Sequence, residues 1–298
     1  MVIAVFNGTA TLGAQLRALE TQVSAPSFEV LVMDNNSSDN VRALVARYPA
    51  LEAKVVPAKR HQGQFYSRNL GVLSARGRHI LICDQDDVVS PRWVRALHDE
   101  LSQRPALATG PIDVTLLNSP GAARAYSGGS NGDSLRPYAV QGYLPFAYGC
   151  NLGIRRDDYI RLGGMDNSYR GGDEDTDFSW RAQEAGLPLV CLDDAVVHYR
   201  LRTTAQALFR QRRGYGRTRV LTWVRSRTRG RTLSGMSLRW SVQQLLLVPV
   251  RWLCARRSPE ELLAWAIFSG AVVGNLEGQL LYRVLRRVPA PQLLDAAQ

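Results

Sequence analysis

In the first two thirds of the chain, short apolar runs alternate with stretches whose apolar residues recur at helical spacing. The short runs predict strands at 2–6, 28–33, 54–56, 79–83, 187–192 and 195–199. The periodic stretches predict helices at 11–22, 40–47, 64–76, 91–103 and 157–162, with a further helix ending at Gly186. Strands separated by helices indicate βαβ units and a mostly parallel α/β sheet. Ligands of such sheets bind beyond the carboxyl ends of the strands.

Charge divides the chain near residue 198. Residues 1–198 carry 19 basic and 22 acidic side chains, a net charge of −3, whereas residues 199–298 carry 18 and 4, a net charge of +14. We therefore expect a near-neutral domain at 1–215 and a basic, apolar helical extension at 216–298. This asymmetry fits an anionic partner, either a membrane surface or nucleic acid. Of the two, we expect a membrane surface and no nucleic acid.

Two apolar runs in this extension, 245–254 and 262–273, are shorter than the roughly 18 uncharged residues of a spanning helix. Arginines lie close to both runs, which favours interfacial or re-entrant helices on a membrane. The alternative is that these helices pack on the preceding domain or in a dimer. Earlier in the chain, the Gly- and Ser-rich stretch 118–143 predicts a long loop, either a lid or a disordered insertion.

The cysteines and the first residues of the chain give expectations for the cellular compartment of the protein. The four cysteines are far apart and include no Cys-x-x-Cys pair, so they predict small buried apolar residues in a reducing compartment. The chain opens on an apolar run without the basic segment of a signal peptide.

Three carboxylates, Asp84, Asp86 and Asp87, follow directly after the predicted strand at 79–83. Mutual repulsion makes such a cluster unfavourable unless a cation or solvent screens it. One interpretation is a solvated acidic turn. The other is a site for Mg²⁺ or Mn²⁺, because these ions prefer oxygen ligands and the substrate phosphates that they bridge.

A second acidic segment, 173–177, follows Gly171 and Gly172 and opens the helix that ends at Gly186. Acids at a helix start stabilise its dipole, so one or two of them are explained by capping. Four acids in five positions exceed that need and indicate a functional site. His198, near the end of the last predicted strand, is either a structural residue or a metal ligand.

These segments, in this order, resemble the family 2 glycosyltransferases, which have the GT-A fold. The resemblance covers about residues 2–215 and departs from the family at Ala4, where the family usually has Pro. It rests on the ordered motifs VIAVFN (2–7), VMDNNSSD (32–39), SRNLG (67–71), DQDDVVSP (84–91), NLGIRR (151–156), LGGMD (162–166) and EDTDFSWR (174–181).

The resemblance implies a donor site. Phe6 and Asp34 would hold the nucleoside, with Asp34 at the base, and Arg68 would approach the diphosphate. Asp86 would face the ribose and the metal, while Asp84 would orient the loop.

It also implies the metal and catalytic residues. Asp87 would be the main metal ligand, together with Asp86 and His198, for Mg²⁺ or Mn²⁺. Asp175 would be the general base, and Glu174 is the neighbour that competes for this role. The stereochemical outcome would be inversion.

The predicted function is therefore transfer of a sugar from a nucleoside diphosphate sugar to an acceptor hydroxyl. The acceptor would be a growing glycan or a lipid-linked molecule of cell-surface glycan synthesis, on the cytoplasmic face of the membrane. One alternative is a sugar-nucleotide-forming nucleotidyltransferase, although the Gly-rich basic loop typical of that class does not follow the first strand. Another alternative is a non-catalytic membrane-peripheral protein, which the four acids Asp86, Asp87, Glu174 and Asp175 argue against.

Overall fold

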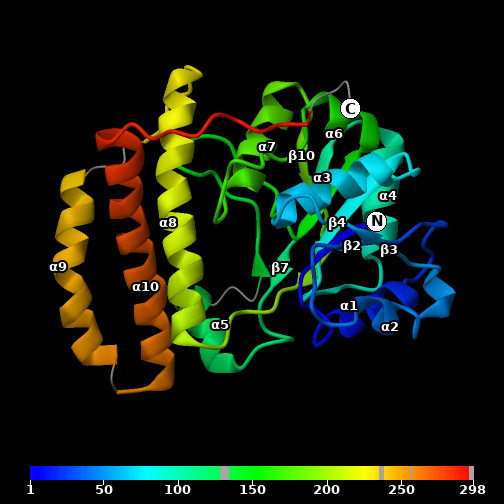
Figure 1. Ribbon diagram of the computed structural model, residues 1–298, viewed down its shortest axis with the longest axis horizontal. Helices are drawn as coiled ribbons and strands as arrows, with labels where there is room; N and C mark the ends of the chain where they lie inside the picture. The colour runs from blue at the N-terminus through cyan, green and yellow to red at the C-terminus, as the bar shows by residue number, and fades with distance from the viewer. Residues whose placement is uncertain (128–133, 235–237, 256, 295–298) are drawn as a thin grey trace.

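The computed structural model describes residues 1–127, 134–234, 238–255 and 257–294, and within these ranges it has an α/β unit followed by a helical extension (Figure 1). The central sheet has seven strands in the order β10-β6-β9-β4-β1-β2-β3. Their bounds are β1 Val2–Val5, β2 Leu31–Asp34, β3 Lys54–Pro57, β4 His79–Asp84, β6 Leu107–Thr109, β9 Asn151–Arg155 and β10 Leu189–Cys191.

The sheet is mostly parallel, as the sequence predicts. Only β9 runs against its neighbours, pairing antiparallel with both β4 and β6. A second, four-stranded sheet lies beyond the carboxyl end of β4. It has the order β5 (Val88–Val89), β11 (Val197–His198), β7 (Ile112–Asp113), β8 (Ser134–Leu135).

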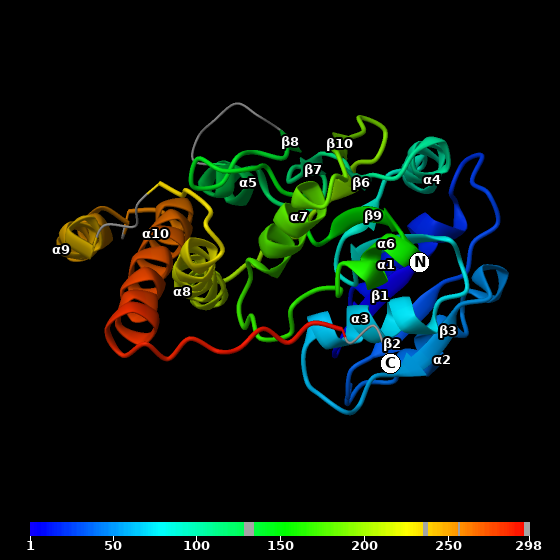
Figure 2. The ribbon, with the colours of Figure 1, turned by 90° about the horizontal axis from the view of Figure 1, so that it is seen from above.

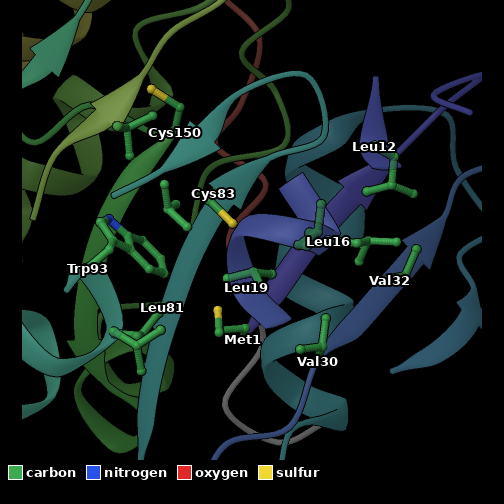
Figure 3. Close-up of a cluster of buried hydrophobic side chains, with 14 of the residues drawn as sticks. Met1, Leu12, Leu16, Leu19, Val30, Val32, Leu81, Cys83, Trp93 and Cys150 are labelled. Carbon is green, nitrogen blue, oxygen red and sulfur yellow. The ribbon is translucent and has the colours of Figure 1, made fainter. Parts of the chain in front are cut away.

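Alternate residues of the central strands fill two apolar cores, one on each face of the sheet. On one face, Ile3 and Val32 pack with residues of helices α1 and α4 (Figure 3). On the other face, Val2 and Ile82 pack with residues of α3, α6 and α7. The period of two explains why the strands read as continuous apolar runs, since both faces are covered.

The helices of this unit are α1 Leu12–Glu20, α2 Val41–Val45, α3 Gln64–Ser74, α4 Trp93–Gln103, α5 Pro120–Ser127, α6 Arg156–Arg161 and α7 Glu174–Glu184, with a short turn η1 at Pro49–Leu51. Each predicted strand and helix is present with shifted ends. The helix expected from residue 91 begins at Trp93, because β5 and the turn after it hold the chain up to Ser90.

Two expectations need correction. The stretch 118–143 is not one long loop, because it contains α5 and β8, and residues 128–133 of the expected lid lie outside the described residues. The four cysteines are not all buried: Cys83 and Cys150 are, whereas Cys191 is partly exposed and Cys254 is exposed.

The extension consists of α8 (Ala205–Thr228), α9 (Leu238–Ala255), α10 (Pro259–Gly278) and the π-helical turn η2 (Gln279–Val284). Helix α10 lies between α8 and α9 (Figures 1 and 2). The second apolar run therefore packs within the helical layer, and the contact of the extension with a membrane stays a prediction. The domain boundary proposed after residue 215 falls inside α8 and stays a prediction. None of the helices in the described ranges is long and apolar enough to cross a membrane.

Glycines allow α10 to approach α8 closely. A Cβ at Gly274 would lie 2.0 Å from the backbone oxygen of Arg213, and one at Gly278 would lie 2.7 Å from that of Arg217. Beyond η2 the chain returns to the α/β unit (Figure 2). There the amide of Leu294 donates to the carbonyl of Gly163 at 2.7 Å.

Candidate active site

The acidic end of β4 is largely shielded from solvent. Asp87 is fully buried, and its Oδ1 accepts a hydrogen bond from the amide of Arg200 at 2.8 Å. Its other oxygen, Oδ2, is buried and has no hydrogen-bond partner among the described residues. Asp86 instead forms an ion pair with Arg202, whose Nη1 lies 3.1 Å from Oδ2 of Asp86.

Burial and like charge raise the pKa of these carboxyls. For Asp87, burial raises the pKa well above its ordinary value, and the negative charges of Asp84 and Asp86 raise it further. For Asp86, burial and the charge of Asp84 raise the pKa, and Arg202 opposes the shift. A cation bound here would take the place of the proton, and its positive charge would offset both the burial of the carboxylates and their mutual repulsion.

The donor atoms at this edge can gather around one ion. One ligand atom each from Asp84, Asp87 and Cys150 lie within 4.8 Å of one another. Burial raises the pKa of the Cys150 thiol, and Asp87 and Asp84 add to that effect, so it stays a neutral thiol. The two carboxylates are the groups suited to Mg²⁺ or Mn²⁺, and the unpartnered Oδ2 of Asp87 has a free coordination position. The residues therefore fit such an ion.

Arg68 of α3 connects the two acidic segments. Its guanidinium is buried and forms an ion pair with Asp84 of β4. On its other side, Nη1 lies 3.8 Å from Oε1 of Glu174, the first residue of α7. A fully buried arginine between two carboxylates keeps these strand and helix ends at a set separation.

Glu174 and Asp175 are adjacent but differ in their surroundings. Glu174 is buried, and within the part of the chain that the structure describes its Oε2 has no hydrogen-bond partner. Burial and the charge of Asp175 raise the pKa of Glu174 well above its ordinary value. Asp175 is partly exposed and accepts hydrogen bonds from the amides of Gly149 at 3.0 Å and Thr176 at 2.8 Å. Burial also raises the pKa of Asp175, while these two amides oppose the rise.

A cavity of about 770 Å³ lies between the acidic ends of β4 and α7. Its lining includes Arg68, Asp84, Glu174 and Asp175, so the structure brings four predicted site residues to one cavity. The remaining wall is rich in aromatic residues: Tyr126, Tyr138, Phe146, Tyr148, Tyr199 and Tyr215.

The other predicted residues lie outside the cavity lining. Phe6 is 49% exposed after β1, and Asp34 ends β2, where its Oδ1 accepts from the amide of Ser37 at 3.1 Å. His198 places its Nδ1 2.5 Å from Oδ2 of Asp113. Within the described residues it is not part of the group around Asp87, and its role as a metal ligand stays a prediction.

Several residues that the sequence did not single out belong to the site. The side-chain oxygen Oε1 of Gln85 accepts a hydrogen bond from the amide of Phe6 at 2.9 Å, which connects the acidic loop to the residue after β1. Arg202, Tyr215 and Arg219 line the cavity from segments that follow the α/β unit. Their spacing along the chain carries no signal, because Tyr215 and Arg219 reach the cavity through the packing of α8 and Arg202 reaches it from the segment between β11 and α8.

Two models of known protein families match parts of this chain. The family model of Glycosyl transferase family 2 matches residues 1–163, more than half of the chain. A second model, described as the N-terminal domain of galactosyltransferase, matches residues 135–202.

Two curated relatives are proteins of Rhizobium meliloti (strain 1021). The succinoglycan biosynthesis protein ExoO is 32% identical over 120 residues, which are 39% of this chain and 34% of that protein. The succinoglycan biosynthesis protein ExoA is 23% identical over 240 residues, covering 76% of this chain and 70% of that protein. The match to ExoO thus spans about a third of that protein's length.

Solved structures share the fold. The mannosyltransferase PcManGT from Pyrobaculum calidifontis, in complex with GDP-Man and Mn²⁺, has a TM-score of 0.60 at 15% identity and covers 92% of this chain and 86% of that chain. S. aureus TarS 1-349 in complex with UDP has a TM-score of 0.50 at 16% identity and covers 95% and 90%. With its ordered motifs, its GT-A-like sheet and the matched family model, the chain belongs to the family 2 glycosyltransferases.

Proposed function

We propose that this glycosyltransferase moves a sugar from a nucleoside diphosphate sugar to an acceptor hydroxyl, with inversion and with a divalent cation. The observation that carries the proposal is that one cavity is lined by Asp84 and Arg68 on one side and by Asp175 on the other. Two structural neighbours carry GDP-Man with Mn²⁺ and UDP, which supports a nucleotide donor here.

On the donor side, Asp87 would hold Mg²⁺ or Mn²⁺ together with Asp84, whose ligand atom lies within 4.8 Å of that of Asp87. Asp86 and His198, which lie outside this group among the described residues, stay predicted further ligands. The ion would neutralise the charge that develops on the departing diphosphate. Arg68 adds a fixed positive charge beside Asp84, and Phe6 and Asp34 lie at the strand ends where the nucleoside would bind.

On the acceptor side, Asp175 is the proposed general base. It takes the proton of the acceptor hydroxyl while that oxygen attacks the anomeric carbon and the bond to the diphosphate oxygen breaks. Asp175 is favoured over Glu174 because it is partly exposed in the cavity, whereas Glu174 is buried. A raised pKa also makes the carboxylate a stronger base than free aspartate. One displacement of this kind inverts the anomeric centre.

The test of this function is a donor screen by thermal shift with UDP-, GDP- and dTDP-sugars and Mn²⁺. A bound donor should raise the melting temperature by mass action, and only when Mn²⁺ is present. Asp87→Asn, which keeps the size of the side chain, is the matched control and should abolish the shift. If none of these donors shifts the wild-type protein, the proposed donor class is wrong.

We further propose that the acceptor belongs to cell-surface glycan synthesis and that the enzyme works at the cytoplasmic face of a membrane. The names of ExoO and ExoA support a polysaccharide as the product. Helix α9 supports the membrane, because its apolar side chains are exposed, with Leu246 at 69% and Leu253 at 61%. Exposed arginines flank this helix in the chain, among them Arg239 near its start and Arg257 after its end.

A further inference from the structure

We infer that helix α8 of the extension positions the catalytic base, and that Arg219 is the residue through which it does so. This inference rests on the proposed function, in which Asp175 is the base. It gives the basic extension a role in catalysis that is separate from attachment to a membrane.

The loop before α7 lies directly on α8. A Cβ at Gly171 would be 2.9 Å from the Cα of Gly214, and one at Gly172 would be 2.5 Å from the ring of Tyr215. The carbonyl of Arg170 also accepts a hydrogen bond from Arg217 at 2.7 Å. The glycine pair therefore serves the approach of α8, since no larger residue would fit between the loop and the helix.

Asp173 then fixes the first turn of α7 to the same helix. It is buried, has a backbone φ of 69° and makes no capping hydrogen bond with its side chain. Instead, its carboxylate accepts from Arg219 at 2.9 Å and from the hydroxyl of Thr222 at 3.0 Å. A left-handed conformation in a residue other than glycine is costly and persists only where contacts hold it. Arg219 and Thr222 are those contacts.

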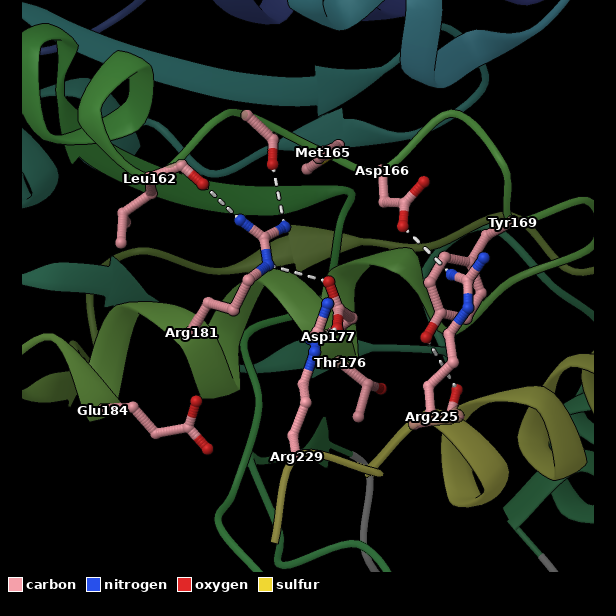
Figure 4. A network of polar contacts seen from close by, with 12 residues as sticks. Leu162, Met165, Asp166, Tyr169, Thr176, Asp177, Arg181, Glu184, Arg225 and Arg229 are labelled. Carbon is pink, nitrogen blue, oxygen red and sulfur yellow. Dashed lines mark hydrogen bonds and ion pairs between the residues drawn. The ribbon is translucent and has the colours of Figure 1, made fainter. Parts of the chain in front are cut away.

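The first turn of α7 and the loop before it are held to α8 by two further ion pairs. Asp177 accepts from Arg229 of the α8 C-cap at 2.8 Å and from Arg181 of its own helix at 2.8 Å (Figure 4). Asp166, in the loop before α7, pairs with Arg225 of α8 at 3.0 Å. Three aspartates around α7 are thus bound by three arginines of α8 and its cap.

Arg219 also acts on the charge of the base. It lines the cavity, and its positive charge interacts with the carboxylates of Asp173 and Asp175. The groups that face Asp175 are Asp173 and Glu174 from its own segment, Arg68 from α3, Tyr148 and Cys150 from the segment before β9, and Tyr215 and Arg219 from α8. Of these, Arg68 and Arg219 carry positive charge.

The experiment compares Arg219→Gln and Arg219→Lys with the wild-type enzyme in steady-state kinetics over pH. Arg219→Gln should lower kcat roughly 10- to 100-fold, the scale of a small misplacement of a catalytic group, with the KM for the donor nearly unchanged. The acidic limb of its pH profile should move to higher pH, because a carboxylate that loses a neighbouring positive charge has a higher pKa. Arg219→Lys keeps the charge and should retain the profile of the wild type.

Arg213→Gln is the matched control, since Arg213 lies on the same helix and pairs with Glu277 at 2.8 Å, away from α7. It should leave kcat and the pH profile unchanged. Thr222→Val provides a second variant that keeps every charge; it should lower kcat without moving the profile. Hydrogen exchange of the amides in 171–178 adds a readout independent of activity and should be faster in Arg219→Gln than in Arg213→Gln.

The inference is overturned if Arg219→Gln keeps the wild-type pH profile, or if exchange in 171–178 matches that of the control. If the wild-type enzyme turns over none of the nucleotide sugars, the proposed function fails, and the exchange result still decides whether α8 positions the segment. The two failures are therefore distinguishable.

Discussion

At the scale of single residues, neighbouring acids in this chain make different contacts, because each has different surroundings. Asp173 binds α8, Glu174 is buried beside Arg68, and Asp175 reaches the cavity. Four acids in five positions indicate a functional segment, and the structure gives them different surroundings: Asp173 contacts α8, whereas Asp175 is partly exposed in the cavity.

Substitution of the two adjacent acids separates their roles. Asp175→Asn keeps the size and removes the basicity, so kcat should fall by roughly 10² or more, the usual scale for loss of a general base. Donor affinity should survive. The measurement is kcat together with the thermal shift by the donor, and Glu174→Gln is the control. An inactive Glu174→Gln beside an active Asp175→Asn would reverse the assignment.

Metal binding should depend on pH with a sign set by Asp86 and Asp87. Their raised pKa means that, without metal, they favour the folded protein below the unfolded-state pKa and that this stability is lost as the pH rises through the folded-state pKa. Mn²⁺ needs the deprotonated carboxylates, so its stabilising effect should grow over the same interval.

The measurement is the shift in melting temperature with Mn²⁺ at about pH 5.5, 6.5 and 7.5. The shift should be largest at the highest pH, and Asp87→Asn should abolish its pH dependence. A shift that is independent of pH in the wild-type protein would contradict a metal site at these two carboxylates.

At the scale of elements, the extension is held by backbone contact between α8 and α10. The glycines of α10 face α8 every fourth residue, at Gly270, Gly274 and Gly278, and bring the two backbones together. Because main-chain atoms cannot move aside as a side chain can, this interface tolerates no added Cβ. The helix that carries Arg219 is therefore itself fixed by α10.

Gly274→Ala should destabilise the protein by about 3 kcal/mol, the upper end for overpacking, because its Cβ would meet the backbone of Arg213. The melting temperature should fall by several degrees. Gly77→Ala is the control, since its Cβ would lie no closer than 3.5 Å to the nearest atom, and its effect should stay within about 0.5 kcal/mol. Equal melting temperatures for the two variants would show that the helices separate without cost.

At the scale of the whole molecule, the +14 charge of the last hundred residues is partly used internally. Seven arginines of this region form ion pairs with described carboxylates: Arg202, Arg213, Arg217, Arg219, Arg225, Arg229 and Arg231. The charge alone therefore overstates what a membrane would meet. The exposed apolar side chains of α9 are the stronger support for contact with a membrane.

Binding to vesicles should depend on the face of α9 that these side chains form. The full chain should sediment with vesicles that contain phosphatidylglycerol and less with neutral phosphatidylcholine, and salt should weaken the binding, since each arginine near an anionic surface contributes about 1 kcal/mol before screening. The double variant Leu246→Glu with Leu253→Glu should lose binding. Leu116→Glu, equally exposed at 64% but on the α/β unit, should not. A full chain that ignores anionic vesicles would assign the face to a second copy, seen as a doubled mass in sedimentation.

The sequence by itself determined the α/β unit and the acidic ends of its elements. Apolar runs of four to six residues become β1, β2 and β4 because both faces of the sheet are covered, and Asp84–Asp87 and Glu174–Asp175 stand at the ends where ligands of such sheets bind. These features depend on local periodicity and on short motifs, which are visible in the chain.

Only the tertiary structure decided the part played by the extension. Arg219 and Tyr215 lie forty or more residues after Asp175, and nothing in their spacing relates them to the loop at 170–173. From the sequence alone, the basic residues of α8 indicate a surface for an anionic partner, because a sequence does not show toward which neighbours a charged side chain points. Folding turns Arg219, Arg225 and Arg229 inward to Asp173, Asp166 and Asp177, since a buried carboxylate needs a partner and these partners come from a distant segment of the chain.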